Sequence, residues 1–249
     1  MIAEMIHTAS LVHDDVVDSS ETRRGKMSVQ SSWGQKNAIV AGDYIMSVSS
    51  IMLARVGNNQ VMEAFSQILE DLVAGEFMQL GSKEDESERF NHYMMKTFKK
   101  TASLLANSCK SVAILGECSA EIIECAYQYG RNVGIAFQLV DDLLDFTSSE
   151  ALMGKPTAAD LKLGLATAPV LFAALEHPEL NAMIMRRFSE PGDVATAWNL
   201  VAKSNGVAQT KMLARQHCQE ALKHLMQLRP SQERSALVTV MHKVLNRLK

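Results

Sequence analysis

Two acidic clusters, each with the pattern Asp-Asp-x-x-Asp, end two apolar stretches of the chain and restrict its local structure more than any other feature. They comprise Asp14, Asp15 and Asp18, and Asp141, Asp142 and Asp145. On a helix, side chains at positions i and i+4 project from one face, so the outer aspartates of each cluster would lie side by side. Like charges at that spacing destabilise a helix unless something neutralises them. Each cluster therefore predicts a helix that ends beside a cation.

A divalent cation is the simplest such neutraliser. Mg²⁺ binds one or two carboxylates and completes its coordination with water and phosphate oxygens, and we predict Asp14, Asp18 and Asp141 as its ligands. Arg23 and Arg24 follow the first cluster closely, and guanidinium groups bind phosphate in a bidentate manner. One acidic run is more often a solvated helix face or a cap. Two clusters of equal spacing together with paired arginines favour a site for Mg²⁺ and a diphosphate.

Composition independently favours an all-α protein. The chain has 249 residues, of which 47% are hydrophobic, enough for one large core, and its net charge of −3 does not suggest nucleic-acid binding. Only 5 residues are Pro, and alternating strand patterns are absent. The four cysteines have no metal-binding spacing and are predicted to be buried free thiols in a reducing compartment. They are Cys109, Cys118, Cys125 and Cys218.

Apolar periodicity divides the chain into long helices. We predict helices over residues 2–18, 36–56, 60–81, 87–116 (broken near Lys100 and Thr101), 119–147, 168–176, 193–204, 206–227 and 231–247, with loops over residues 19–27 and 148–167. The segment 36–56 is almost entirely apolar, so it is expected to be central. Charged residues interrupt the apolar runs before the roughly 18 to 20 residues of a membrane span, and the start lacks the features of a signal or transit peptide.

The sequence resembles the all-trans polyprenyl diphosphate synthases, and among them the long-chain decaprenyl and solanesyl diphosphate synthases of mitochondria. The resemblance rests on the segments AEMIHTASLVHDDVVDSSETRRGK, AIVAGDYIMS, EDLVAGEFMQLGS, TFKKTASLLANSC, GIAFQLVDDLLDFT and MGKPTAADLKLGLATAPV. Their order and spacing run through the whole chain. The resemblance implies the isoprenoid synthase fold, a bundle of long helices around a central apolar cavity, with the two acid clusters facing each other across its mouth.

The resemblance also implies an activity. A Mg²⁺-dependent prenyltransferase of this family condenses isopentenyl diphosphate with an allylic diphosphate, here to a long-chain product expected to become the ubiquinone side chain in the mitochondrion. A homodimer, or a hetero-oligomer with a second synthase subunit, is expected. The alternative is a non-catalytic or truncated partner subunit that regulates or stabilises a synthase. A terpene cyclase is a third possibility, against which the second Asp-Asp-x-x-Asp cluster argues.

By resemblance, further residues acquire roles in binding the two substrates. The isopentenyl diphosphate side is assigned His7 and Arg24, and the allylic side is assigned Arg23, Lys100, Thr101 and Lys155, while Gln138 is placed beside the substrate. Asp160 is assigned to the second metal or to Lys155. From the residues alone, His7 is more often a satisfied core histidine, Lys100 a solvated lysine and Gln138 a core amide.

Product length is expected to depend on the two residues that lie five and four positions before the first cluster, Ala9 and Ser10. They lie about one helical turn below Asp14. In short-chain relatives a bulky aromatic residue there closes the cavity, so two small side chains predict an open channel and a long product.

The sequence departs from the family pattern in two places. The upstream Gly-Lys-x-x-Arg segment that binds isopentenyl diphosphate is not in this chain, so we expect residues 1–249 to form a single but N-terminally incomplete domain that is weakly active alone. Where the family often has Gly-Lys after the second cluster, this chain has Gly164-Leu165.

Overall fold

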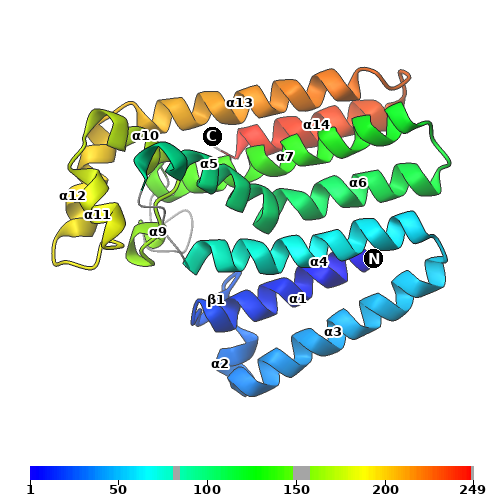
Figure 1. Cartoon of the computed structure of the whole chain (residues 1–249), viewed down its shortest axis with the longest axis horizontal. Helices are drawn as coiled ribbons and strands as arrows, with labels where there is room; N and C mark the ends of the chain where they lie inside the picture. The colour runs from blue at the N-terminus through cyan, green and yellow to red at the C-terminus, as the bar shows by residue number, and fades with distance from the viewer. Residues whose placement is uncertain (81–84, 148–157, 248–249) are drawn as a thin grey trace. The chain divides into compact units, whose positions relative to one another are not determined.

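The computed structural model describes residues 1–80, 85–147 and 158–247, whose regular structure is almost entirely helical (Figure 1). The predicted all-α class is confirmed. The chain divides into two compact units, Met1–Gln67 and Ile68–Lys249, which are described separately. The single-domain expectation stays a prediction.

The first unit is built around helix α1 (Ile2–Val17), which packs against α2 (Val29–Trp33) and α3 (Gln35–Val56). Between α1 and α2, the predicted loop contains a hairpin of two-residue strands, β1 (Thr22–Arg23) and β2 (Lys26–Met27), paired antiparallel. Its turn residues Arg24 and Gly25 have φ angles of 53° and 75°, the left-handed values that tight hairpin turns require. Strands this short carry no alternating pattern, so the sequence did not predict them.

Helix α3 forms where predicted, but the expectation that it is central is wrong. Its buried residues are Ala38, Gly42, Ser49 and Leu53, a narrow stripe made mostly of small side chains. Tyr44 on the same helix is 70% exposed. At Gly42 an added Cβ would lie 2.1 Å from Nε2 of His13, so glycine permits the close approach of α1 and α3. Apolar composition predicted the helix but not the number of its neighbours.

Among the described helices, α3 alone has the length and composition of a membrane span, with a mean hydropathy of 1.4 over an 18-residue window, 17% of which is buried. Core helices of globular proteins pass the same test, so length and composition assign no membrane role to α3.

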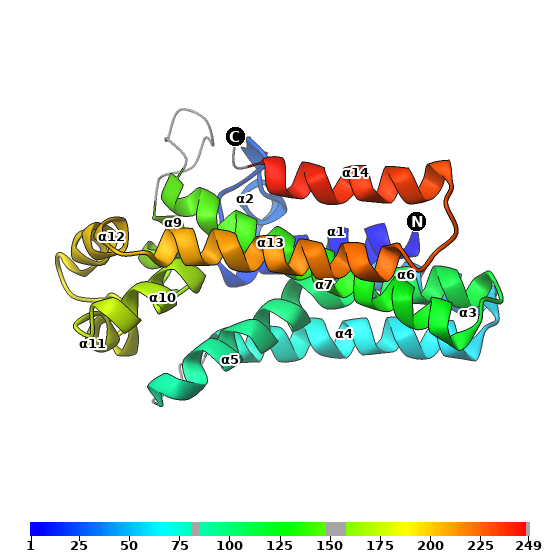
Figure 2. The ribbon, with the colours of Figure 1, turned by 90° about the horizontal axis from the view of Figure 1, so that it is seen from above.

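Helix α7 (Ala120–Thr147) is the centre of the second unit (Figure 2). It packs against α6 (Ser103–Leu115), α13 (Gly206–Leu225) and α14 (Gln232–Asn246). Gly130 and Gly134 bring α7 against the helical segment that precedes it, because an added Cβ at either position would lie 2.6 Å from a backbone atom there. Fully buried side chains such as Leu139 and Val140 extend this contact into one apolar core.

The other helices agree closely with the periodicity. They are α4 (Asn59–Leu80), which spans both units, α5 (Glu86–Thr97), α10 (Ala168–Glu176) and α12 (Asp193–Lys203). The break predicted near Lys100 and Thr101 is confirmed as a π-helical turn, Phe98–Ala102. Three short helices were not predicted, namely α2, α9 (Ala159–Lys162) and α11 (Leu180–Met185). Helices of four to six residues are too short for a periodic apolar pattern.

The four cysteines are all free, as predicted, but they are not all buried. Cys125 and Cys218 are buried, Cys109 is half-buried, and Cys118 is exposed. Cys118 lies in the connection between α6 and α7, where the chain turns at the surface.

Candidate active site

The first acid cluster ends α1 and divides its aspartates between two faces. Asp14 and Asp18 lie on a partly exposed face, as the spacing predicts. Asp15 is only 2% exposed. Its Oδ1 accepts hydrogen bonds from Arg23 Nε at 2.9 Å and from Arg23 Nη2 at 2.5 Å. Arg23 therefore neutralises the one buried carboxylate of this cluster.

The other residues predicted in the first unit are placed around this helix end. His7 and Ser10 share the partly exposed face with Asp14, and Ser10 Oγ donates to the His7 carbonyl at 2.9 Å. Ala9 has no exposed surface and belongs to the neighbouring buried stripe of α1. Arg24 is exposed at the hairpin turn. The structure thus groups His7, Ser10 and Asp14, but it places Ala9 and Arg24 apart from that face.

The second acid cluster ends α7, and its central carboxylate is held by uncharged donors. Asp142 is 2% exposed, and Tyr93 Oη and Gln138 Nε2 donate to its two carboxylate oxygens, the latter at 2.9 Å. Thr101 Oγ1 donates to Gln138 Oε1 at 2.9 Å. Burial raises the pKa of Asp142 to about 6, although both hydrogen bonds act in the opposite direction. A hydrogen-bonded chain therefore joins the π-helical turn to the acid cluster.

The flanking carboxylates of this cluster have other partners. Asp145 accepts hydrogen bonds from the backbone N–H groups of Ala159 at 3.0 Å and Asp160 at 3.2 Å, and so caps α9. Asp141 is half exposed and lies 3.3 Å from Nη2 of Arg247.

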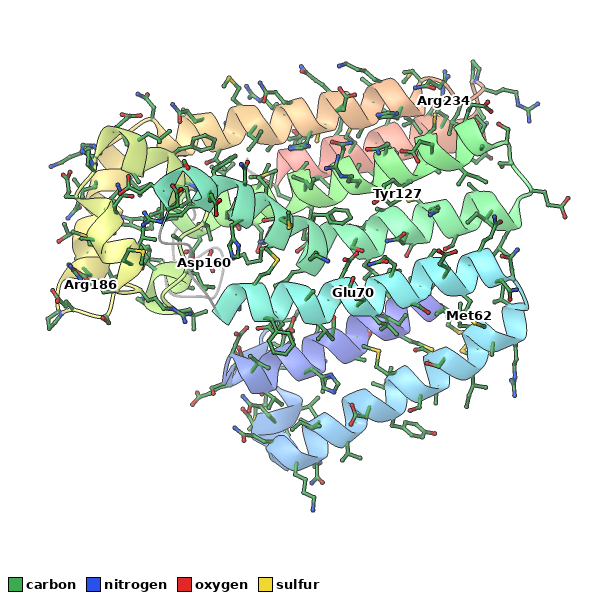
Figure 3. The ribbon with its side chains drawn as sticks, in the orientation of Figure 1. Met62, Glu70, Tyr127, Asp160, Arg186 and Arg234 are labelled. Carbon is green, nitrogen blue, oxygen red and sulfur yellow. The ribbon has the colours of Figure 1, made fainter. Side chains whose placement is uncertain are left out.

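Asp160, labelled on α9 in Figure 3, adds a fourth carboxylate to this end of α7. Burial raises the pKa of Asp160 to about 8, and the carboxylates of Asp142, Asp145 and Asp141 act in the same direction. The second unit therefore concentrates negative charge here.

Lys100 crosses from the π-helical turn to α4. Its Nζ lies 2.5 Å from Glu76 Oε2 and donates to Gln79 Oε1 at 3.0 Å. An added Cβ at Gly75 would lie 2.7 Å from Cγ of Lys100, so glycine makes room for this lysine. Lys100 is held in place by α4, and it is not the solvated lysine that composition alone suggested.

Two neighbours of the site were missed by sequence reasoning. Tyr93 and Lys96 lie on α5, seven and four residues before Lys100. That helical spacing was the available signal, but nothing in the sequence linked α5 to Asp142. The predicted residue Lys155 lies outside the described residues.

The carboxylates fit a divalent cation that also binds substrate. Within residues 1–80, 85–147 and 158–247, no three side chains of His, Cys, Asp or Glu form a group that could hold a metal ion. Mg²⁺ commonly takes only one or two carboxylates, together with water and phosphate oxygens. Asp14 and Asp18 supply such a pair and Asp141 supplies a further carboxylate, and the raised pKa values of Asp142 and Asp160 mark charge that an added cation would offset.

Comparison with known proteins identifies the family. The polyprenyl synthetase model matches residues 1–201. The chain is 62% identical over 247 residues to a Homo sapiens all-trans-polyprenyl-diphosphate synthase, covering 99% of this chain and 60% of that protein. It is 42% identical over 254 residues to solanesyl-diphosphate synthase 1, mitochondrial, of Oryza sativa subsp. japonica, covering 100% of this chain and 59% of the relative. The chain thus spans about 60% of the length of these relatives.

Solved structures give the same answer for the fold. An apo Arabidopsis medium/long-chain length prenyl pyrophosphate synthase is 37% identical with a TM-score of 0.83, covering 100% of this chain and 80% of that one. A Caulobacter crescentus polyprenyl synthase, complexed with calcium and isoprenyl diphosphate, is 29% identical with a TM-score of 0.89, covering 100% and 77%. The predicted isoprenoid synthase fold is confirmed, and the chain belongs to the polyprenyl synthetase family.

Proposed function

We propose that this chain carries the metal-dependent ionisation site of a trans-prenyltransferase. The reaction condenses isopentenyl diphosphate with an allylic diphosphate and repeats until a long-chain polyprenyl diphosphate is formed. The observation that carries the proposal is the hydrogen-bonded chain from Thr101 through Gln138 to Asp142. It connects a turn that presents Lys100 with the end of the helix that presents Asp141 and Asp145.

The chemistry needs positive charge at a departing diphosphate and little else from the protein. The C1–O bond of the allylic substrate breaks, and its electron pair leaves on the diphosphate. The double bond of isopentenyl diphosphate then attacks the allylic cation at C1. Loss of a proton to the released diphosphate restores a double bond and leaves the chain one isoprene unit longer. Bound Mg²⁺ would supply charge at the diphosphate.

The chain's own residues would orient the substrates and stabilise charge. Asp14 and Asp18 from α1, and Asp141 from α7, are the proposed cation ligands. Lys100 would exchange its contact with Glu76 for a diphosphate oxygen, with the hydroxyl of Thr101 beside it. These are charge-assisted contacts, the strongest class of hydrogen bond.

Three remaining roles are proposed in the first unit and one outside the described residues. Arg23 would bind the allylic diphosphate, while His7 and Arg24 would bind isopentenyl diphosphate. Lys155 is proposed for the allylic side by family resemblance alone. Arg23 already pairs with Asp15, so its role in binding would be shared with that carboxylate.

The relatives support a product and a location. We propose that the product supplies the ubiquinone side chain and that the protein acts in mitochondria, because the rice relative is named as a mitochondrial solanesyl-diphosphate synthase. The exposed apolar residues of α3, among them Tyr44 and Val40, support a homodimer or a hetero-oligomer. No observation on the structure favours a purely non-catalytic subunit.

The test is incorporation of radiolabelled isopentenyl diphosphate into a long-chain product, with a farnesyl-type allylic primer and added Mg²⁺. Asp141→Asn should reduce elongation by about 100-fold or more, because it removes a proposed cation ligand. Glu121→Gln, an exposed change at the other end of the same helix, should not. Substrate binding without any turnover by the unmodified protein would overturn the proposal in favour of a non-catalytic subunit.

A further inference from the structure

A solvent-open pocket in the second unit, with a cavity volume of about 60 Å³, is lined by several basic side chains. They are Arg89, His92, Lys96 and Arg187, which come from α5 and from the residues after α11. Gln79, Tyr93 and several apolar side chains complete the lining, and none of the lining residues that the structure describes is acidic. The carboxylates of Asp142 and Asp160 act on Lys96 from outside this lining, so an anion that enters the pocket would contact the basic side chains directly.

Lys96 is the least compensated of these cations. Its Nζ lies 5.8 Å from the centre of the Tyr93 ring, and within the described part of the chain no hydrogen bond or ion pair to Nζ is present. Burial lowers the pKa of Lys96, and Lys100 acts in the same direction, whereas Asp142, Asp160 and Glu76 raise it from a distance. A half-buried ammonium group with no direct counter-ion would be stabilised by an anion in the pocket.

Arg89 gives the pocket a rigid wall. It is only 7% exposed, and its Nη1 donates to Asn181 Oδ1 on α11 at 2.7 Å. One turn further along α5, His92 Nε2 lies 3.1 Å from the Met78 carbonyl of α4. Both side chains are therefore fixed by hydrogen bonds between helices, so the cationic lining is pre-organised.

Arg187 lines the pocket from a different part of the chain, where its backbone lies close to Gly164. Its φ is 55°, a left-handed conformation that few non-glycine residues adopt. It packs on Gly164, whose φ is 77°, and an added Cβ at Gly164 would lie 3.3 Å from Nε of Arg187 and 3.0 Å from its Cβ. Left-handed backbone at both positions holds this arginine against the pocket, and such conformations concentrate at functional sites.

We propose that this pocket binds a diphosphate group directly through its basic side chains, without a divalent cation. The site adjoins the proposed reaction centre, because Tyr93 also donates to Asp142 and Gln79 accepts from Lys100. Inorganic diphosphate released by the reaction is one source of the ligand, and the head group of an isoprenyl diphosphate is the other. Only this choice of source rests on the proposed function.

Binding measured in the absence of divalent cations distinguishes this pocket from the acid clusters. Carboxylate clusters repel diphosphate unless metal is present, whereas a basic pocket binds it in EDTA. Calorimetric titration of the protein with inorganic diphosphate in EDTA should therefore show binding. Lys96→Gln should weaken that binding by about tenfold or more, the effect of losing one charge-assisted contact.

Two variants control for charge and fold. Lys96→Arg keeps the cation and should stay within a few-fold of the unmodified protein. Lys211→Gln makes the same change on an exposed part of α13 and should leave the affinity unchanged. Equal affinities for Lys96→Gln and Lys211→Gln, or no binding of diphosphate in EDTA by a folded protein, would overturn the proposal.

A second titration with isopentenyl diphosphate identifies the source. Tighter binding than inorganic diphosphate, again dependent on Lys96, assigns the pocket to an isoprenyl diphosphate head group. Weaker binding assigns it to the released diphosphate.

Elongation assays with Mg²⁺ are run on the same samples. Elongation without binding in EDTA refutes the pocket alone, and binding in EDTA without elongation refutes the proposed function alone.

Discussion

The two acid clusters share one sequence pattern, but the protein neutralises their buried carboxylates differently. Asp15 and Asp142 are each 2% exposed. Asp15 is paired with a cation, Arg23, whereas Asp142 is held by a hydroxyl and an amide. A dipole stabilises a buried negative charge less than a full positive charge does, and burial accordingly raises the pKa of Asp142 to about 6. The same motif therefore depends on an added cation to different degrees in its two copies.

The largest expected effect tests whether both clusters bind cations despite this difference. Asp14→Ala and Asp141→Ala should each reduce kcat by about 100-fold or more, because each removes a proposed ligand of the charge that stabilises the departing diphosphate. Steady-state elongation at saturating Mg²⁺ is the measurement, with circular dichroism to verify the fold. Glu124→Ala, exposed on α7, is the matched control. Near-normal rates in either aspartate variant would remove that cluster from the proposed site.

Removing the partner of the buried aspartate should destabilise the protein by different amounts in the two clusters, because one partner is charged and the other is neutral. Arg23→Gln leaves a buried carboxylate without its cation and should destabilise the metal-free protein by about 2–3 kcal/mol. Tyr93→Phe removes one neutral donor from Asp142, which can bind a proton instead, and should cost only about 1 kcal/mol. Urea unfolding near pH 7 provides both values. If the two losses were equal, the charge of the partner would not be what distinguishes the clusters.

The pH dependence of stability should come from the second cluster. The folded pKa values of Asp142 and Asp160, about 6 and about 8, lie above the ordinary value of 3.8. Protonation therefore favours the folded state: the contribution is fully present below about pH 4 and is lost as the pH rises through about 6 and then about 8. The melting temperature of the metal-free protein should fall over this range by at least about 2–4 °C, which corresponds to about 1 kcal/mol.

Asp160→Asn and added Mg²⁺ sharpen this test. In the Asp160→Asn variant, the melting temperature should no longer fall near pH 8, but it should still fall near pH 6. Mg²⁺ should flatten the whole decline, because a bound cation replaces the protons. A melting temperature that rises steadily from pH 5 to pH 8.5 in EDTA would show that burial does not govern these carboxylates.

The structural features that depend only on residues close together in the chain were predicted correctly from the sequence. Helix α10 has the predicted bounds of 168–176, and the break at Lys100 and Thr101 is a π-helical turn. Periodicity and motif spacing are local properties, so they transfer directly to helices. The resemblance likewise identified the family and fold from motifs spread over the whole chain.

What was missed depends on contacts between distant segments. The exposure of α3 depends on how many helices surround it, and the role of Tyr93 depends on α5 packing beside the end of α7. The pairing of Arg23 with Asp15 needs the two-residue hairpin that turns the chain back. None of these contacts leaves a periodic signal, because each is decided by tertiary packing.

The smallest effect on rate, and the most specific, concerns the residues five and four positions before each cluster. They are Ala9 and Ser10 in the first copy and Ala136 and Phe137 in the second. Only the second copy has an aromatic residue, and Phe137 is 37% exposed with Arg247 stacked 4.6 Å from its ring centre. An aromatic ring is thus tolerated before the second cluster, where it packs at the surface.

Ala9→Phe should shorten the product while the first condensation keeps its rate within a few-fold, because the first short tail does not yet reach one helical turn below Asp14. Ala9 has no exposed surface, so a phenylalanine there must displace its neighbours or occupy space that the growing tail needs. Ser10→Phe places the same ring on the partly exposed face that Ser10 shares with Asp14. Comparing the two variants shows along which face of α1 the growing tail passes. Phe137→Ser is the control in the second copy and should leave product length unchanged. Reverse-phase chromatography of the products reports length independently of how much protein is folded. An unchanged product in both first-copy variants would show that the tail does not pass along α1.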